Sequence, residues 1–304
     1  MSQNLTPFRL LLRYARLLDL LAGALLYALG AGLTVYLGNQ INWSHYFLGQ
    51  GCMTMLQLSA YFLKSAFDLP AQNEILIKNI QDEEIRQQAV VITRNTVLLA
   101  AASALTAGAV LTVILFSKGL INTNALIIIG IGLALVLAYA IPPFRLVYSG
   151  YGELIQAILI ANISPALSFT IQFGELHQLL ASLTFPLTAL YVALQLANSL
   201  HNYTQDERNQ RQTALTRLGW AHGMNLHNLL ILFAYLVMVS SSLIDLPWVL
   251  LRSGLLTLPI GLFQIWLMLR IARGSKPNWL LLSVTAAATF TLTAYFIAFS
   301  LWTS

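Results

Sequence analysis

The chain has 304 residues, of which 58% are hydrophobic and only 9% are charged, and its mean hydropathy is +0.72. Soluble domains carry about 25% charged residues, so this composition excludes a soluble globular protein and indicates a polytopic protein embedded in the lipid bilayer. The net charge of +5 does not indicate a nucleic-acid partner, because the sequence has no soluble domain in which basic and aromatic residues alternate.

Nine apolar segments are long enough to cross a bilayer, whose hydrocarbon core needs roughly 20 residues of helix. In chain order they cover about 17–37, 45–67, 95–117, 122–142, 151–173, 178–201, 224–244, 248–270 and 279–301. The sequence therefore predicts an all-α, multi-pass membrane protein with nine transmembrane helices. Asp19, near the start of the first segment, is interpreted as a helix-end residue.

The basic residues orient the predicted spans. Fourteen of the sixteen Lys and Arg residues fall at the N-terminus or in loops on its side of the membrane, and only Lys118 and Arg252 fall on the other side. The positive-inside rule then places the N-terminus in the cytoplasm, in a bacterial inner membrane or a plasma membrane. The polar loops at about 68–94 and 202–222 cap the cytoplasmic face, where we expect the active site. Within the first loop, residues 73–94 are predicted to form an interfacial amphipathic helix.

Two groups of polar residues lie at the cytoplasmic ends of the second and sixth segments. They are Lys64, Asp68 and Gln72 in the first group and Asn198, Asn202 and Asp206 in the second. The four-residue spacing places each group on one face of a helix. The groups lie 134 residues apart, which indicates an internal duplication of about 1–145 and 146–304 within a single domain of residues 1–304.

The chemistry of these groups favours a phosphate site. Ionisable residues that face a cavity within a membrane are functional candidates, because their desolvation is costly. Oxygen ligands on two facing helices suit Mg²⁺, which in turn binds phosphate oxygens. Two alternatives remain open at this point: ordinary interfacial residues at helix ends, and a secondary transporter, although transporters usually place such groups near the midplane of the membrane.

A third element, YAIPPFRLVYSGYGEL at Tyr139–Leu154, connects the fourth and fifth segments. The Pro-Pro pair ends the preceding helix, since neither proline has a backbone N–H to donate. Arg145 is therefore expected at the same cytoplasmic face as the two polar groups. Gly150 and Gly152 allow a tight re-entry into the membrane before Glu153.

Together the three elements resemble those of the UbiA superfamily of intramembrane prenyltransferases. YAIPPFRLVYSGYGEL is similar to the superfamily pattern YxxPPxRLxxxGxGE, and NYTQDERNQRQTALTRLG is similar to a motif that ends in GKRTLAVRLG. The resemblance implies a helical bundle around a central cavity. It also implies Mg²⁺-dependent transfer of a prenyl group from a polyprenyl diphosphate to an aromatic acceptor. The first pattern is most similar to the branch that prenylates 1,4-dihydroxy-2-naphthoate in menaquinone biosynthesis.

The resemblance also implies roles for particular residues. Catalytic roles fall on Asp68, Asp206 and Arg145, and Mg²⁺ ligation falls on Asp68, Asp206, Asn198 and Asn202. Substrate binding falls on Lys64, Arg211, Asn198, Asn202, Gln72, Tyr139 and Glu153.

The chain departs from the superfamily pattern at three of these positions. Lys64 replaces an asparagine, and Gln72 and Asn202 replace aspartates. Losing two carboxylates weakens the expected Mg²⁺ site, so a catalytically degenerate protein that binds a prenyl lipid or a partner is the alternative. Lys64 could neutralise a phosphate oxygen directly, or it could extend to the membrane interface or pair with Asp68.

Overall fold

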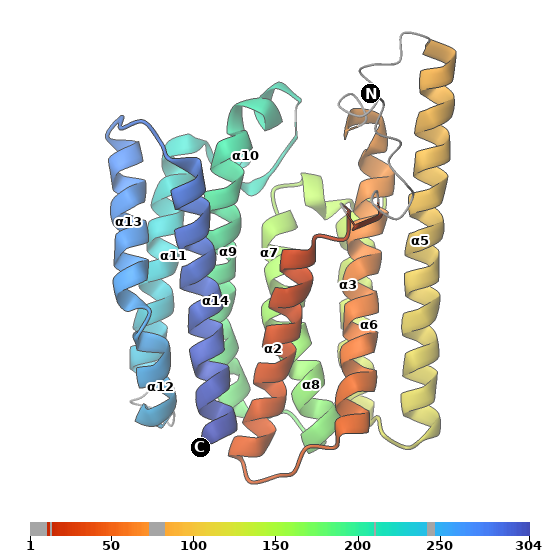
Figure 1. Ribbon diagram of the computed structural model, residues 1–304, viewed down its shortest axis with the longest axis vertical. Coiled ribbons are helices and arrows are strands. Elements are labelled where there is room, and N and C mark those ends of the chain that lie inside the picture. The colour runs from red at the N-terminus through yellow and green to blue at the C-terminus, as the bar shows by residue number, and fades with distance from the viewer. Residues whose placement is uncertain (1–10, 13, 73–82, 210, 242–246) are drawn as a thin grey trace.

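The computed structural model describes residues 11–12, 14–72, 83–209, 211–241 and 247–304, and every regular element in these ranges is helical (Figure 1). The elements are α2 (Leu17–Tyr36), α3 (Trp43–Gln72), α5 (Glu83–Ser117), α6 (Thr123–Ala140), η1 (Leu146–Tyr148), α7 (Gly152–Ile158), η2 (Leu159–Ile163), α8 (Ser164–Phe173), α9 (Gln178–Arg208), α10 (Ala214–Leu218), α11 (Trp220–Ser241), α12 (Trp248–Leu255), α13 (Leu258–Ala272) and α14 (Trp279–Thr303). The predicted all-α class is confirmed.

Seven helical stretches in the described ranges are long and apolar enough to cross a membrane, as judged by length and composition. They are Leu17–Tyr36, Thr93–Ser117, Thr123–Ala140, Gly152–Phe173, Gln178–Arg208, Trp220–Ser241 and Trp279–Thr303. The two other predicted spans, 45–67 and 248–270, coincide with α3 and with the pair α12 and α13.

The predicted interfacial helix at 73–94 differs from the structure. Residues 73–82 lie outside the described ranges, but from Glu83 onward the chain is part of α5, which continues to Ser117. No Gly or Pro interrupts the sequence between Glu83 and Arg94. The helix therefore extends without a break into the membrane-length segment that follows.

The backbones of α2 and α8 lie in close contact. A Cβ atom added at Gly30 would lie only 2.2 Å from the carbonyl oxygen of Pro165, so this contact requires glycine. The Ser164 hydroxyl donates a hydrogen bond of 2.9 Å to the carbonyl oxygen of Gly23 on the same side of α2. Helix α2 also packs against α14, and most of its residues from Ala22 to Thr34 are buried.

The parts of the chain that carry the three sequence elements meet at one end of the bundle. The C-terminal ends of α3 and α9, the connection between α6 and α7, and the short helix α10 lie at this end, while the C-terminus lies at the opposite end (Figure 1). The fold therefore brings together segments that are more than a hundred residues apart in the sequence.

Candidate active site

A polar cavity of about 250 Å³ lies where the three elements meet, and we call it the polar chamber. Seven of the ten predicted site residues line it: Lys64, Tyr139, Glu153, Asn198, Asn202, Asp206 and Arg211. Arg16, Tyr148, Gln156, Gln195, Ser199 and Thr213 are among its other lining residues. The side chain of Gln72 lies outside the described part of the structure. Asp68 and Arg145 do not line the chamber and form a separate pair.

Helix α9 supplies one wall of the polar chamber. Asn198, Asn202 and Asp206 follow one another at four-residue intervals and all face the chamber, as their spacing predicts. The Asp206 carboxylate lies 3.8 Å from Nη1 of Arg211. In addition, the backbone N–H of Arg211 donates to the carbonyl oxygen of Asp206 at 2.9 Å. The chain thus turns immediately after α9 and returns Arg211 to the chamber.

Glu153 connects the second motif to the α6–α7 connection. Its two carboxylate oxygens accept from the backbone N–H of Ala214 at 3.3 and 3.2 Å, at the start of α10. The N–H of Gly150 donates to the carbonyl oxygen of Gln212 at 2.9 Å. These bonds hold two polar segments of the site in a fixed register.

Gly150 and Gly152 make this register possible. Gly150 has a φ of +81°, which side-chain-bearing residues rarely adopt, and a Cβ added to it would lie 2.8 Å from Cδ of Arg217. A Cβ added to Gly152 would lie 2.9 Å from Cα of Val147. The tight re-entry predicted from these two glycines therefore matches the geometry of the connection.

Asp68 and Arg145 form a buried ion pair beside the chamber. Nη2 of Arg145 lies 2.7 Å from Oδ1 of Asp68 and also donates to the carbonyl oxygen of Phe67 at 2.9 Å. The Asp68 side chain is only 1% exposed, and its Oδ2 has no hydrogen-bond partner among the described residues. Arg145 itself is in the left-handed region at φ 37°. This pair fixes the α6–α7 connection against the end of α3.

Tyr148 lies between this pair and the chamber. Cζ of the Arg145 guanidinium lies 4.7 Å from the centroid of the Tyr148 ring. The Tyr148 side chain also lines the chamber. Burial and, next, the nearby Asp68 carboxylate raise the pKa of the Tyr148 phenol well above its ordinary value. The phenol therefore keeps its proton at neutral pH and can act as a hydrogen-bond donor.

Lys64 differs from the other cations of the chamber. It lies one helical turn before Asp68 on α3 and lines the chamber. Within the described part of the structure its ammonium group makes no hydrogen bond or ion pair, and the Oδ1 atom of Asp68 is bound by Arg145 instead. By contrast, Arg16 and Arg211 each lie within 4.0 Å of a carboxylate oxygen.

A second polar network was not expected from the sequence. Oδ2 of Asp19 lies 2.7 Å from Nε of Arg16 and accepts from Nε2 of Gln156 at 3.0 Å. Oδ1 accepts from the Tyr191 hydroxyl at 2.7 Å, and that hydroxyl accepts from Nε2 of Gln195 at 2.7 Å. Asp19 is thus the centre of a network that joins the three helices α2, α7 and α9 rather than a simple helix-end residue. The three-residue spacing of Arg16 and Asp19 was the sequence signal that could have indicated it.

Arg16 carries a charge into this network. Burial acts to lower the pKa of its guanidinium, but the Asp19 carboxylate and nearby phenols outweigh burial and raise it. Nη1 of Arg16 also donates to Oε1 of Gln156 at 3.1 Å. The arginine is therefore held as a cation where the polar chamber meets a second cavity.

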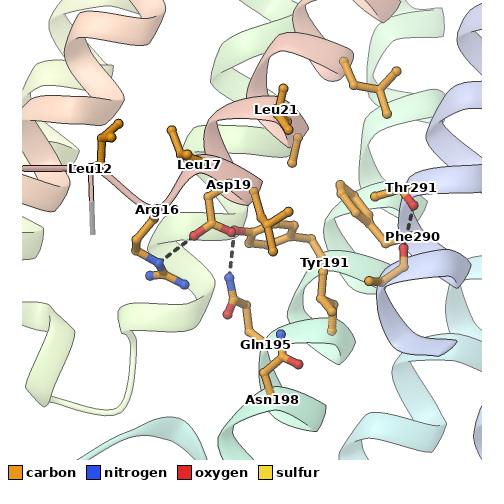
Figure 2. Close-up of a pocket in the computed structure, with 15 residues that line it drawn as sticks. Leu12, Arg16, Leu17, Asp19, Leu21, Tyr191, Gln195, Asn198, Phe290 and Thr291 are labelled. Carbon is orange, nitrogen blue, oxygen red and sulfur yellow. Dashed lines mark hydrogen bonds and ion pairs between the residues drawn. The ribbon is translucent and has the colours of Figure 1, made fainter. Parts of the chain in front are cut away.

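This second cavity, of about 550 Å³, is mainly apolar and lies between α2, α9 and α14. It is lined by Leu12, Leu17, Leu18, Asp19, Leu21, Ala22, Leu25, Tyr191, Leu194, Ala287, Phe290 and Thr291, together with Arg16, Gln195 and Asn198. The last three also line the polar chamber. Figure 2 shows Arg16, Asp19, Tyr191 and Gln195 gathered at one side of this cavity. The two cavities are therefore neighbours that share part of their lining, one of them polar and the other mainly apolar.

The donor groups suit one metal ion better than two. Asp206, Asn198 and Asn202 offer a carboxylate and two amide oxygens toward the chamber, and Mg²⁺ is commonly bound by one or two carboxylates together with substrate phosphates. At the first motif, Arg145 engages the carboxylate of Asp68 and Lys64 adds another cation nearby. Among the residues that the structure describes, no group of three or more His, Cys, Asp or Glu side chains is placed to hold a metal ion.

Comparison with solved structures identifies the class of the fold. A digeranylgeranylglyceryl phosphate synthase superposes with a TM-score of 0.68 over 98% of this chain and 99% of that protein, at 14% sequence identity. A UbiA homologue from Archaeoglobus fulgidus bound to GPP and Mg²⁺ superposes with a TM-score of 0.61 over 97% of this chain and all of that chain, at 15% identity. The same homologue bound to Cd²⁺ gives a TM-score of 0.57 at 14% identity. The chain has the fold of the UbiA-type prenyltransferases, and the predicted resemblance is confirmed at the level of fold.

Comparison of sequences finds a similarity over a shorter part of the chain. The 1,4-dihydroxy-2-naphthoate octaprenyltransferase of Bacillus subtilis (strain 168) is 25% identical over 89 residues, which are 29% of this chain and 29% of that enzyme. No protein-family model matches the chain. The apolar helices and the shared fold identify the chain as an integral, multi-pass membrane protein.

Proposed function

We propose that the protein transfers a prenyl group from a polyprenyl diphosphate to an aromatic acceptor, a quinone precursor of the 1,4-dihydroxy-2-naphthoate type, and releases diphosphate. The observation that carries the proposal is the joined site, in which a polar chamber adjoins an apolar cavity through Arg16, Gln195 and Asn198. This arrangement suits a donor with a charged head and a long apolar tail. The naphthoate acceptor rests on the sequence motifs and on the likeness to the Bacillus subtilis enzyme.

The residues of the chamber have distinct roles in this proposal. Arg211 and Lys64 bind the diphosphate, and the protonated phenol of Tyr148 donates a hydrogen bond to it. Asp206, with Asn198 and Asn202, would hold one Mg²⁺ ion. When bound, the ion supplies positive charge that stabilises the diphosphate as it leaves.

The Asp68–Arg145 pair has a positioning role in this proposal. Because Arg145 already binds Oδ1 of Asp68, the pair orients Tyr148 and the α6–α7 connection instead of contacting the donor. Tyr139 and Glu153 shape the chamber, and Glu153 also holds α10 in place through the N–H of Ala214.

The proposal includes nine membrane spans and a cytoplasmic N-terminus. Helix α3 and the pair α12 and α13 would supply the two spans beyond the seven apolar helices. The chamber would then open toward the cytoplasm, on the side of the membrane where fourteen of the sixteen Lys and Arg residues fall. We also propose a single domain of residues 1–304 with related halves of about 1–145 and 146–304.

Purified protein in detergent or nanodiscs tests the function directly. With Mg²⁺, a panel of prenyl diphosphates and a panel of dihydroxynaphthoate and hydroxybenzoate acceptors, we expect a prenylated product and an equal amount of released diphosphate. Glu175→Gln, an exposed substitution outside the site, is the matched control and should leave the rate unchanged. Absence of turnover with every donor and acceptor pair would contradict the proposal.

A second candidate is a catalytically degenerate protein that binds prenyl lipid without turnover. The observation that favours it is the loss of two motif carboxylates at Gln72 and Asn202. The double variant Gln72→Asp with Asn202→Asp separates the two candidates. Activity that appears only in this variant supports degeneracy, whereas wild-type activity that is lost in Asp68→Ala supports the enzyme.

A further inference from the structure

The charges of the polar chamber are arranged to attract an anion before any metal ion is added. Among the residues that the structure describes, three cations line it, Arg16, Lys64 and Arg211, and two carboxylates do so, Glu153 and Asp206. Both carboxylates are engaged, Glu153 with the N–H of Ala214 and Asp206 with Arg211. A site built for two divalent cations would instead need an excess of negative ligands.

Of the three described cations that line the chamber, Lys64 is the one whose charge is still available. Arg16 is bound to Asp19 at 2.7 Å, and Arg211 lies 3.8 Å from Asp206. Within the described residues, Lys64 has no such partner although it lies one turn from Asp68, whose Oδ1 atom is bound by Arg145. Lys64 therefore neither completes an ion pair with Asp68 nor leaves the chamber for the membrane surface.

The same geometry disfavours a metal ion at the first motif. A divalent cation at Asp68 would lie beside the Arg145 guanidinium, which is 2.7 Å from Oδ1, and near the Lys64 ammonium one turn away. Like charges at such distances repel strongly in a desolvated site. The buried Oδ2 atom of Asp68 could offer one ligand, but no second carboxylate of the first motif is present in the sequence.

We propose that Lys64 binds the diphosphate group of the donor directly and takes the place of a metal ion at the first motif. The site then uses a single metal ion, held at Asp206. An ammonium group is a compact positive charge with three donors, and it can neutralise a phosphate oxygen without further ligands. The departure of the first motif from the superfamily pattern, with Lys64 in place of an asparagine and Gln72 in place of an aspartate, is then a change in how the diphosphate is held rather than a loss of the site. The inference rests on the proposed function only for the chemical class of the donor.

Calorimetric titration of inorganic diphosphate into the full-length chain in detergent, with EDTA present, tests this role. We expect wild type to bind diphosphate without metal and Lys64→Gln to bind it about 10- to 100-fold more weakly, as for loss of a hydrogen bond to a charged group. Lys118→Gln removes the same charge at an exposed position outside the site and should bind like wild type. Lys64→Arg keeps the charge and should retain most of the affinity.

Two results would overturn the inference: diphosphate binding by wild type that is lost in EDTA, or equal binding by Lys64→Gln and wild type. If Lys64→Gln does not fold, the number of bound Mn²⁺ ions decides the question. Electron paramagnetic resonance of wild type saturated with inorganic diphosphate should count one Mn²⁺ per chain, and two would contradict the inference.

The outcomes separate this inference from the proposed function. Lys64-dependent binding of diphosphate in EDTA, without turnover of any prenyl donor, would contradict the function and leave the role of Lys64 intact. Prenyl transfer by wild type, together with diphosphate binding that is unchanged in Lys64→Gln, would support the function and contradict the role of Lys64.

Discussion

Asp19 offers a sharp test of the unexpected network between the two cavities. Its carboxylate lies 2.7 Å from Nε of Arg16 and accepts from Gln156 at 3.0 Å and from the Tyr191 hydroxyl at 2.7 Å. The side chain is 13% exposed, so water replaces few of these contacts. Asp19→Asn preserves the shape of the side chain but removes its charge. It also replaces one acceptor oxygen by an amide N–H group, which then faces the donors that the oxygen had bound.

The expected cost follows from these contacts. A hydrogen bond to a charged group contributes about 1.5–3 kcal/mol, whereas polar contacts between membrane helices average about 0.6 kcal/mol and reach about 1.7. The Arg16 side chain is 35% exposed, so its share must be discounted for solvent screening. We expect Asp19→Asn to lower the free energy of unfolding by about 2–3 kcal/mol. Tyr191→Phe removes one of the three contacts and should cost about 1 kcal/mol.

Unfolding by SDS in mixed micelles measures both substitutions and the double variant. Because Asp19 and Tyr191 share the same hydrogen bond, the two losses should fall short of additivity by about 0.5–1 kcal/mol. Glu175→Gln makes the same carboxylate-to-amide change at an exposed position and should stay within about 0.5 kcal/mol of wild type. A loss in Asp19→Asn as small as that of the control, or full additivity with Tyr191→Phe, would refute the reasoning.

Three further substitutions test other parts of the site. Arg211→Gln should raise the KM for the prenyl diphosphate about 10- to 100-fold, while Arg273→Gln, exposed and remote, should not change it. Arg145→Gln leaves the buried Asp68 carboxylate unpaired and should lower the free energy of unfolding by about 3 kcal/mol, and adding Asp68→Asn should recover part of this loss. Full stability of Arg145→Gln alone would show that the pair is not structural. Leu25→Trp narrows the apolar cavity and should reduce turnover of long-chain donors about tenfold relative to a five-carbon donor; an equal effect on both donors would place the tail elsewhere.

The sequence predicted the features that depend on composition and on spacing along one helix. An all-α membrane fold follows from the excess of apolar residues. The three polar residues of α9 face the chamber because four-residue spacing places side chains on one face of a helix. The Pro-Pro pair and the glycines after it predicted a turn that does bring Glu153 to the second motif.

The remaining features depend on contacts between distant helices, which no local pattern encodes. Arg145 and Asp68 are 77 residues apart, so their pairing could not be foreseen, and the prediction that both face the substrate gave no reason to expect it. Asp19 looked like a helix-end residue because its partners Gln156 and Tyr191 come from helices more than a hundred residues away. The interfacial helix predicted over residues 73–94 is, from Glu83 onward, part of the continuous helix α5.

A structure of the protein with a bound prenyl diphosphate tests the central claim most directly. The account predicts the diphosphate in the polar chamber between Lys64 on α3 and Arg211 after α9, with the prenyl tail in the apolar cavity beside Leu25. A diphosphate found outside the chamber, or a tail directed away from the apolar cavity, would contradict it.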